Sequence, residues 1–296
     1  MPTKDNVRIA SGKSAAKNDQ EYFSGAVPGP LNESIAIRAL GGFTVTVDGK
    51  PIERWRASKA CQLLQYLLLR RGRAVSRDQL NDALWPESAW SNGSSSLKVA
   101  AHVLRRVLAE HGAENGAGSS LRLVTTESGY RLSADNVLVD FERFNELVDY
   151  GYVLQREGND AEALPCYQRA VALYPGDFLP GVQLPWAAEY REWLRSRFLC
   201  TMEYIVENQL RDADFQGAVH SCMRILEVDP LHEKVYRSLM VLHGLLGQLN
   251  QVIRWYRLCE VRLRDELQVE PDRRTRQLYD HAIHGRLTRE HLAVAP

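Results

Sequence analysis

Four polar side chains recur at intervals of three or four residues between Asn92 and Glu110. They are Ser95, Lys98, His102 and Arg105. Residues at this spacing share one side of a helix, so the hydroxyl, the imidazole and the two cations would lie in one row. Such groups can hydrogen-bond the edges of nucleic-acid bases, and the cations also attract phosphates.

An apolar stripe in the same segment predicts the helix that would carry this row. The stripe consists of Leu97, Ala101, Leu104 and Leu108. Its three- and four-residue spacing is typical of a helix with one buried side. One of the serines at 94, 95 and 96 is expected to cap the helix, and the glycines at 112, 116 and 118 are expected to end it.

Two short strands are expected after the glycines, LRLVT from Leu121 and GYRL from Gly129, with a turn beside Glu127 and Ser128. A helix followed by a hairpin is typical of a winged helix. The hairpin adds three candidate contact residues, Arg122, Thr125 and Arg131. Tyr130 is expected to pack beneath it. A polar helix side is often only a solvated face, but its combination with a basic hairpin favours DNA binding, because the major groove admits a helix.

Length and composition favour two ordinary globular domains. The chain has 296 residues, of which 45% are hydrophobic and 25% charged. It has no N-terminal apolar segment typical of secretion and no run long enough to span a bilayer, so we expect a cytoplasmic protein without membrane contact. The 5 cysteines are scattered without a C-x-x-C pair, which favours core positions over a disulfide frame or a metal site.

The formal net charge of zero hides an uneven distribution. Residues 34–135 hold 14 Lys and Arg against 9 Asp and Glu, whereas residues 136–296 hold 19 against 24. A basic part joined to an acidic part suggests that the first meets a polyanion and the second meets protein.

The first domain is expected to span residues 34–135, after a flexible tail at 1–33. Alternating β-branched residues from Ser34, followed by the Asp48–Gly49 turn signal, predict a small antiparallel sheet. Apolar periodicity then predicts a helix over Ser58–Arg71. A second helix is expected to be capped by Ser76 and ended by Pro86.

Several motifs in this region resemble the OmpR-type winged helix. They are K-x-x-x-L-L-x-Y-L-L-L from Lys59, V-S-R-D-Q-L-x-x-A-L-W-P from Val75, L-R-R-V-L from Leu104 and S-G-Y-R-L from Ser128. With the helical region behind it, the chain is similar over residues 35–284 to the antibiotic-regulatory, or SARP-type, bacterial transcriptional activators. The resemblance implies a domain that reads direct repeats near promoters, fused to a bacterial transcriptional activation domain. Because residues near Lys98 vary in the family, it implies no particular target sequence.

The second domain is expected over residues 136–284, before a C-terminal tail at 285–296. Its signals are helical, and three units repeat: Gly158, Ala213 and Gly247 are equivalent, and so are Ala163, Ala218 and Val252. Ala213 and Gly247 lie 34 residues apart, which is the period of a tetratricopeptide repeat. Stacked helix pairs of this kind leave a concave surface suited to binding protein.

No pattern in the chain supports catalysis or a cofactor. It has no phosphate-binding G-x-x-x-x-G-K-[ST] loop, no G-x-S-x-G elbow and no H-E-x-x-H motif. The histidines 220, 232 and 243 lack metal-ligand spacing. The aromatic residues Trp186, Tyr190, Trp193 and Phe198 could line a ligand pocket, but their spacing more often indicates packing between helices.

The sequence therefore predicts a mainly α protein, an α+β winged helix-turn-helix followed by an all-α, tetratricopeptide-like repeat domain. The function that it favours is a non-enzymatic activator that binds double-stranded DNA and contacts RNA polymerase. A homodimer on DNA is one candidate assembly. The alternatives are a helical-repeat adaptor whose first domain docks on protein, and a ligand-sensing regulator. A chain ending near Asp135 is expected to keep its DNA preference and to lose activation.

Overall fold

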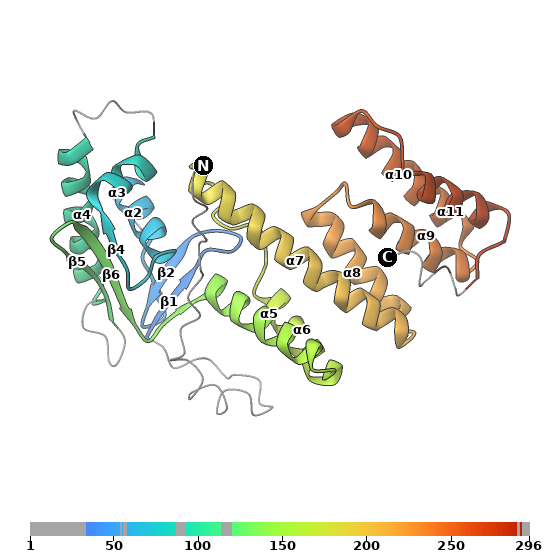
Figure 1. Ribbon diagram of the computed structural model, residues 1–296, viewed down its shortest axis with the longest axis horizontal. Helices are drawn as coiled ribbons and strands as arrows, with labels where there is room; N and C mark the ends of the chain where they lie inside the picture. Colours follow the sequence, from blue (N-terminus) through green and yellow to red (C-terminus); the bar gives the residue numbers. More distant parts are fainter. Residues whose placement is uncertain are drawn as a thin grey trace, which may run out of the picture.

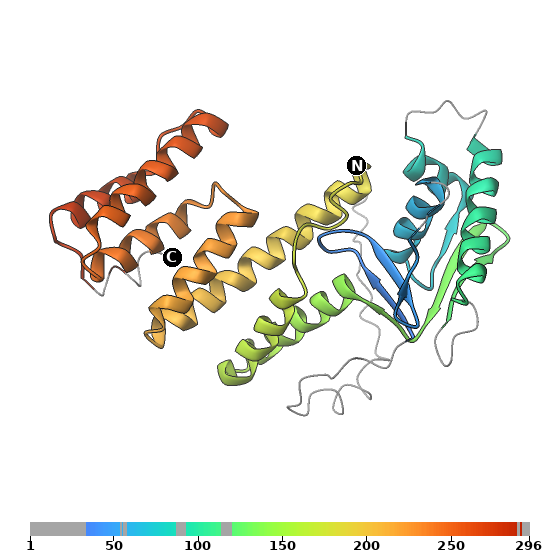
Figure 2. The same ribbon diagram turned by 180° about the vertical axis from the view of Figure 1, so that it is seen from behind.

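The computed structural model describes residues 34–53, 55, 58–86, 93–113, 120–288 and 291. The expected tail at 1–33 lies outside this range. An α+β half at one end of the molecule is followed by a row of helices that extends away from it (Figures 1 and 2). The mainly α class and the order of its two parts are as predicted.

The first sheet is built from four strands that are distant in sequence. β1 (Ile35–Arg38), β2 (Thr44–Val47), β3 (Lys50–Pro51) and β7 (Val137–Val139) lie in the order β3-β2-β1-β7. The first three strands are antiparallel, as predicted, whereas β7 runs parallel to β1 with Ile35 opposite Val137. β7 was not predicted, because a three-residue strand has no periodicity of its own.

Three helices and a second sheet complete the α+β half. They are α2 (Ser58–Leu68), β4 (Ala74–Ser76), α3 (Arg77–Leu84), α4 (Gly93–Glu110), β5 (Ser120–Thr125) and β6 (Gly129–Asp135). The second sheet has the order β4-β6-β5, so β5 and β6 form the expected hairpin. Ser76 caps α3 as predicted, and Gln79 completes a capping box in which each side chain bonds the other's backbone.

A buried carboxylate joins the α+β half to the helices behind it. Asp140 accepts hydrogen bonds from the backbone N–H groups of Ala39 at 2.9 and 2.8 Å, Leu40 at 2.9 Å and Phe141 at 2.7 Å. Burial raises the pKa of Asp140 to about 6, although these donors act in the opposite direction. The carboxylate thus fastens the end of β1 to the start of the helical half.

Further contacts make this joint continuous. The backbone of Leu40 pairs with that of Phe178, and Arg71 forms a 2.9 Å ion pair with Glu142. The rings of Tyr66 on α2 and Trp186 meet edge to face at 5.3 Å. A chain ending near Asp135 would lose β7 and all these partners. The DNA preference expected of such a fragment stays a prediction, and its test must first show that the fragment folds without these contacts.

The helical half consists of seven helices within the described residues. They are α5 (Asp140–Arg156), α6 (Asp160–Ala172), α7 (Pro185–Arg211), α8 (Phe215–Val228), α9 (Glu233–Leu245), α10 (Leu249–Leu267) and α11 (Arg273–Ile283). The equivalence of Gly158, Ala213 and Gly247 is confirmed, because each lies in a turn with positive φ, at 80°, 59° and 70°. The residues five positions later, Ala163, Ala218 and Val252, are all fully buried.

The aromatic residues of α7 pack between elements, as their spacing indicated. Tyr190 meets Phe141 and Phe178 edge to face at 5.6 and 5.0 Å. Phe198 stacks on Tyr174 at 4.4 Å. Trp193 is the exception, since 45% of its surface is exposed.

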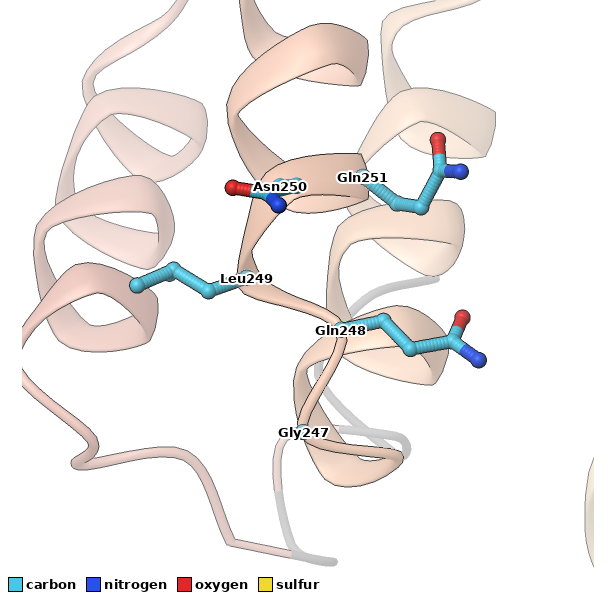
Figure 3. A pocket seen from close by; sticks show the side chains of 5 residues that line it. All are labelled: Gly247, Gln248, Leu249, Asn250 and Gln251. Carbon is cyan, nitrogen blue, oxygen red and sulfur yellow. The ribbon is translucent and has the colours of Figure 1, made fainter.

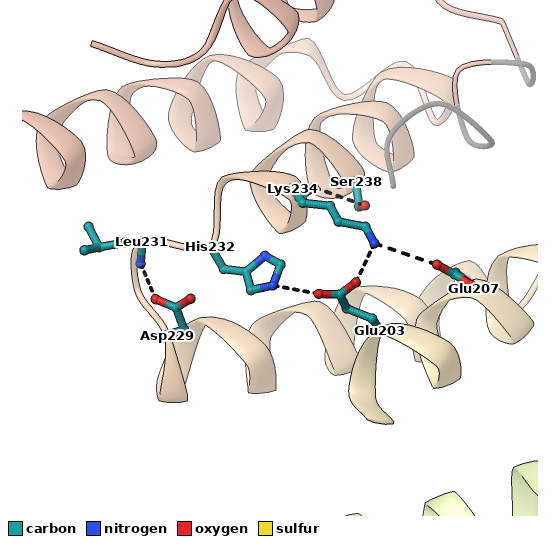
Figure 4. A network of polar contacts seen from close by, with 7 residues as sticks. All are labelled: Glu203, Glu207, Asp229, Leu231, His232, Lys234 and Ser238. Carbon is teal, nitrogen blue, oxygen red and sulfur yellow. Dashed lines mark hydrogen bonds and ion pairs between the residues drawn. The ribbon is translucent and has the colours of Figure 1, made fainter. Parts of the chain in front are cut away.

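An ionic network links consecutive repeat units (Figure 4). Glu203 on α7 contacts His232 Nε2 at 2.9 Å and also binds Lys234 at the start of α9. The hydrogen bond with His232 and the charge of Lys234 hold the pKa of Glu203 at about 2, against the opposing effect of burial. The ionised carboxyl therefore stabilises the α7–α9 contact.

We expect the free energy of unfolding to fall as the pH is lowered from about 4.5 to about 2. In this window the unfolded chain binds a proton at Glu203, whereas in the folded chain the contacts with His232 and Lys234 keep the carboxyl ionised. Glu203→Gln should remove this part of the pH dependence and destabilise the protein at pH 7. Urea midpoints at several pH values measure both effects. Glu207→Gln, at the looser 3.8 Å contact with Lys234, is the control. Equal pH profiles for wild type and Glu203→Gln would contradict this assignment.

Candidate nucleic-acid interface

α4 has a fully buried side and an exposed side. Leu97, Ala101, Leu104 and Leu108 are each at most 1% exposed, so the predicted apolar stripe is confirmed. The opposite side exposes Ser95, Lys98, Val99, His102 and Arg106. The row of polar side chains predicted from Ser95, Lys98 and His102 thus reaches solvent from a helix that is anchored along its whole length.

The expected serine cap of α4 is wrong. The helix begins at Gly93, so Ser95 and Ser96 lie inside its first turn. Both are exposed there. Their hydroxyl groups consequently belong to the outer surface of the helix.

Arg105 differs from the other members of the predicted row because it contacts the hairpin. Its Nε donates to the backbone oxygen of Leu123 at 3.0 Å, and its Nη2 donates to Thr125 Oγ1 at 2.6 Å. The guanidinium also lies 5.7 Å from the centre of the Tyr130 ring. The structure therefore brings Arg105 and Thr125 together, and places Arg105 on the flank of α4 rather than at the centre of its exposed side.

The hairpin presents different residues on its two faces. Leu121 and Leu123 are buried toward the helices, whereas Arg122 between them is exposed. Thr125 pairs with Tyr130, which is 6% exposed and packs beneath the hairpin as expected.

Arg122 and Arg131 lie on the outer face of the hairpin, away from α4. Arg131 is exposed opposite Val124, and Arg122 is opposite Ser133. Arg122 also lies 3.9 Å from the carboxylate of Asp135. Because these cations are on the face that does not touch α4, they form a second cationic surface beside the exposed side of α4.

Sequence reasoning missed three residues near the candidate interface. Val99 is 60% exposed at the centre of the outer side of α4. Arg106 lies beyond His102 on that side, 3.5 Å from Glu110. Arg77 donates through Nη1 to the backbone oxygen of Glu127, 3.1 Å away at the hairpin tip. A helical projection of α4 would have shown Val99 and Arg106, whereas no local signal pairs Arg77 with residues fifty positions away.

Within the described ranges, no group of three or more His, Cys, Asp or Glu residues could hold a metal ion. In the same part of the chain, no helix is both long enough and apolar enough to cross a bilayer.

Two hollows lie among the described residues of the helical half, with volumes of about 440 and 20 Å³. One lies at the α9–α10 turn and is lined by residues 247–251, where the side chains of Leu249 and Gln251 point to opposite sides (Figure 3). The other, beside Glu203 and Ser238, has a volume of about 20 Å³. That is room for a single water molecule.

Comparison with known families adds two matches that follow each other along the chain. A model described as "Transcriptional regulatory protein, C terminal" matches residues 54–132. A model described as "Bacterial transcriptional activator domain" matches residues 139–283. The first covers α4 and the hairpin, and the second covers the repeated helices.

Two relatives agree with these matches. Transcriptional regulator RedD of Streptomyces coelicolor is 31% identical over 220 residues, which are 73% of this chain and 61% of RedD. Regulatory protein AfsR of the same organism is 28% identical over 248 residues, 82% of this chain and 24% of AfsR. The chain thus spans less than two thirds of either relative. A solved structure, Mycobacterium tuberculosis EmbR in complex with a low-affinity phosphopeptide, shares the fold with a TM-score of 0.66 and 21% identity. The match covers 88% of this chain and 69% of EmbR.

Proposed function

The chain belongs to the SARP-type family of bacterial transcriptional regulators. We propose that it binds promoter DNA through α4 and the hairpin, and that it raises transcription through its helical half. In this proposal α4 enters the major groove with Ser95, Lys98 and His102 facing the bases. Thr125, Arg122 and Arg131 approach the phosphate backbone from the hairpin. Arg105 supports the hairpin between them.

The exposed side of α4 is the observation that carries the proposal. Its polar residues share a rigid helix whose other side is buried, and the hairpin lies beside it at a distance fixed by hydrogen bonds. A helix in the major groove with flanking contacts to phosphates is a common arrangement in DNA recognition. The excess of positive charge in residues 34–135 agrees with a polyanionic partner.

The helical half supports a protein partner in this proposal. Residues 136–296 carry more acidic than basic side chains, and their stacked helix pairs expose an extended surface. RNA polymerase is the partner that an activator at a promoter must recruit. We further propose that two copies bind adjacent repeats, and that the protein works in the cytoplasm, where bacterial DNA lies.

Binding of the full chain to duplexes selected from a random-sequence pool tests the proposal. We expect selection to converge on a repeated sequence, and affinity to fall steeply with salt, because phosphate contacts release counterions. The selected sequence placed before a reporter gene should raise its transcription in the presence of the chain. Failure to enrich any sequence, together with affinity that is insensitive to salt, would leave docking on protein as the better explanation of the first domain.

Val99 should contact a thymine methyl group, because it is an apolar side chain at the centre of the side that meets the groove. Replacing thymine by deoxyuridine removes only that methyl. At one position of the selected site, this change should weaken wild-type binding by roughly fourfold, the equivalent of one buried methyl group. Val99→Ala should bind more weakly and should no longer distinguish the two bases. If every deoxyuridine substitution affects both proteins equally, Val99 does not touch a thymine.

A further inference from the structure

Two arginines from different helices hydrogen-bond the exposed end of the hairpin. Arg105 of α4 donates to Leu123 O at 3.0 Å and to Thr125 Oγ1 at 2.6 Å. Arg77, the first residue of α3, donates from its side chain to Glu127 O at 3.1 Å and from its backbone to Ser128 O at 3.0 Å. The end of the hairpin is therefore hydrogen-bonded to two different helices.

Tyr130, which is 6% exposed opposite Thr125, supplies apolar packing at this end of the hairpin. Leu121, Leu123 and Leu132 are buried near its base, whereas Thr125, Glu127 and Ser128 are exposed. β6 is also paired with β4, as far as Gly129 opposite Ser76, whereas β5 is the edge strand of this sheet. The position of β5 and of the turn consequently depends on the polar contacts and on Tyr130, over which the Arg105 guanidinium lies.

The chemistry of Arg105 suits a structural bridge. The planar guanidinium loses little freedom for each hydrogen bond it makes, and charged donors form the stronger bonds. Two of its three nitrogen atoms donate within the protein, and the side chain is half-buried. Arg106, the next residue, instead points to solvent and meets only Glu110 of the same helix among the ion pairs of the described residues.

We propose that Arg105 is a positioning residue, which fixes the hairpin against α4 before DNA binds so that helix and hairpin meet the duplex as one rigid surface. This inference rests on the proposed function. A hairpin that must become ordered on binding would cost affinity, whereas a preorganised one does not. Thr125 accepts a hydrogen bond from Arg105, and Arg77 binds the turn at Glu127 and Ser128.

Hydrogen exchange of the free, full-length chain tests the positioning role without DNA. In Arg105→Ala and in Thr125→Val, the amides of residues 125–130 should exchange roughly tenfold faster, because a charged hydrogen bond is lost, while those of α5–α11 are unchanged. The double variant should be no faster than Arg105→Ala, and Thr125→Ser should restore slow exchange. Arg122→Ala is the control, since it removes an arginine from the same hairpin without a contact to α4. Unchanged exchange in Arg105→Ala would overturn the inference.

DNA binding supplies the readout that separates positioning from direct contact. Arg105→Ala and Thr125→Val should weaken binding to the selected duplex by a similar factor, roughly two- to tenfold, with an unchanged salt slope. A slope that is flatter by about one in Arg105→Ala alone would mean that Arg105 touches a phosphate directly, and would also overturn the inference. If no duplex is selected at all, the proposed function fails, and the exchange result still decides whether Arg105 holds the hairpin.

Discussion

Asp140→Ala should lower the free energy of unfolding by roughly 3 to 5 kcal/mol, because it leaves several buried N–H donors without their charged acceptor. The donors belong to Ala39, Leu40 and Phe141, and all three contacts are buried. Ala39 and Leu40 follow β1 directly. The loss of their hydrogen bonds to Asp140 should therefore loosen the junction between the α+β half and the helices. We expect unfolding in urea to occur in two steps in this variant, where the wild type unfolds in one.

Urea unfolding, followed by the fluorescence of tryptophans in both halves, measures this effect. Asp135→Ala is the matched control, because Asp135 is exposed and its contacts with Ser120 and Arg122 lie at the surface. That change should cost less than about 1 kcal/mol. Asp140→Asn should fall between the two, since an amide oxygen can still accept. Equal stability of Asp140→Ala and Asp135→Ala would mean that apolar packing alone holds the joint.

Leu104→Ala should destabilise the chain by roughly 2 to 5 kcal/mol, because it opens a cavity beneath α4. Leu104 is 0% exposed on the buried side of α4. Thermal or urea unfolding measures the loss. At temperatures where the variant remains folded, its preference among DNA sequences should be close to that of the wild type.

Val99→Ala provides the opposite result on the same helix. Because Val99 is 60% exposed, its removal should change stability by less than about 0.5 kcal/mol while abolishing the discrimination between thymine and deoxyuridine. The two variants together separate the side of α4 that holds the fold from the side that reads DNA. A Leu104→Ala protein as stable as the wild type would show that α4 is not packed as described.

Elements with local signals were predictable from the sequence. Ser76 could be identified as a cap because the residue that reciprocates, Gln79, is three positions away. The repeat turns were identifiable because Gly158 and Gly247 suit positive φ, and Ala213 takes the same conformation at the equivalent place. The buried stripe of α4 followed from helical spacing alone.

Features that depend on distant residues were not predictable. β7 exists because it pairs with β1, about a hundred positions earlier in the chain, and Asp140 accepts from the same segment. The role of Arg105 was ambiguous for a related reason, because its spacing from Lys98 and His102 also fits a row of side chains that faces the groove. Only the folded hairpin shows that the Arg105 guanidinium donates a hydrogen bond to Thr125. The sequence therefore predicted that the site consists of a helix and a hairpin. It did not predict which side chains are exposed and which ones join the helix to the hairpin.

The most direct test of the central claim is the ratio of affinities for the selected duplex and a random duplex, measured at one salt concentration. We compare the wild type with the combined variant Ser95→Ala, Lys98→Ala, His102→Ala, whose three side chains are exposed and whose fold circular dichroism can confirm. If the outer side of α4 reads bases, the ratio should fall by about tenfold or more, while affinity for the random duplex changes far less. An unchanged ratio in the folded variant would contradict the account, because sequence would then be read elsewhere in the molecule.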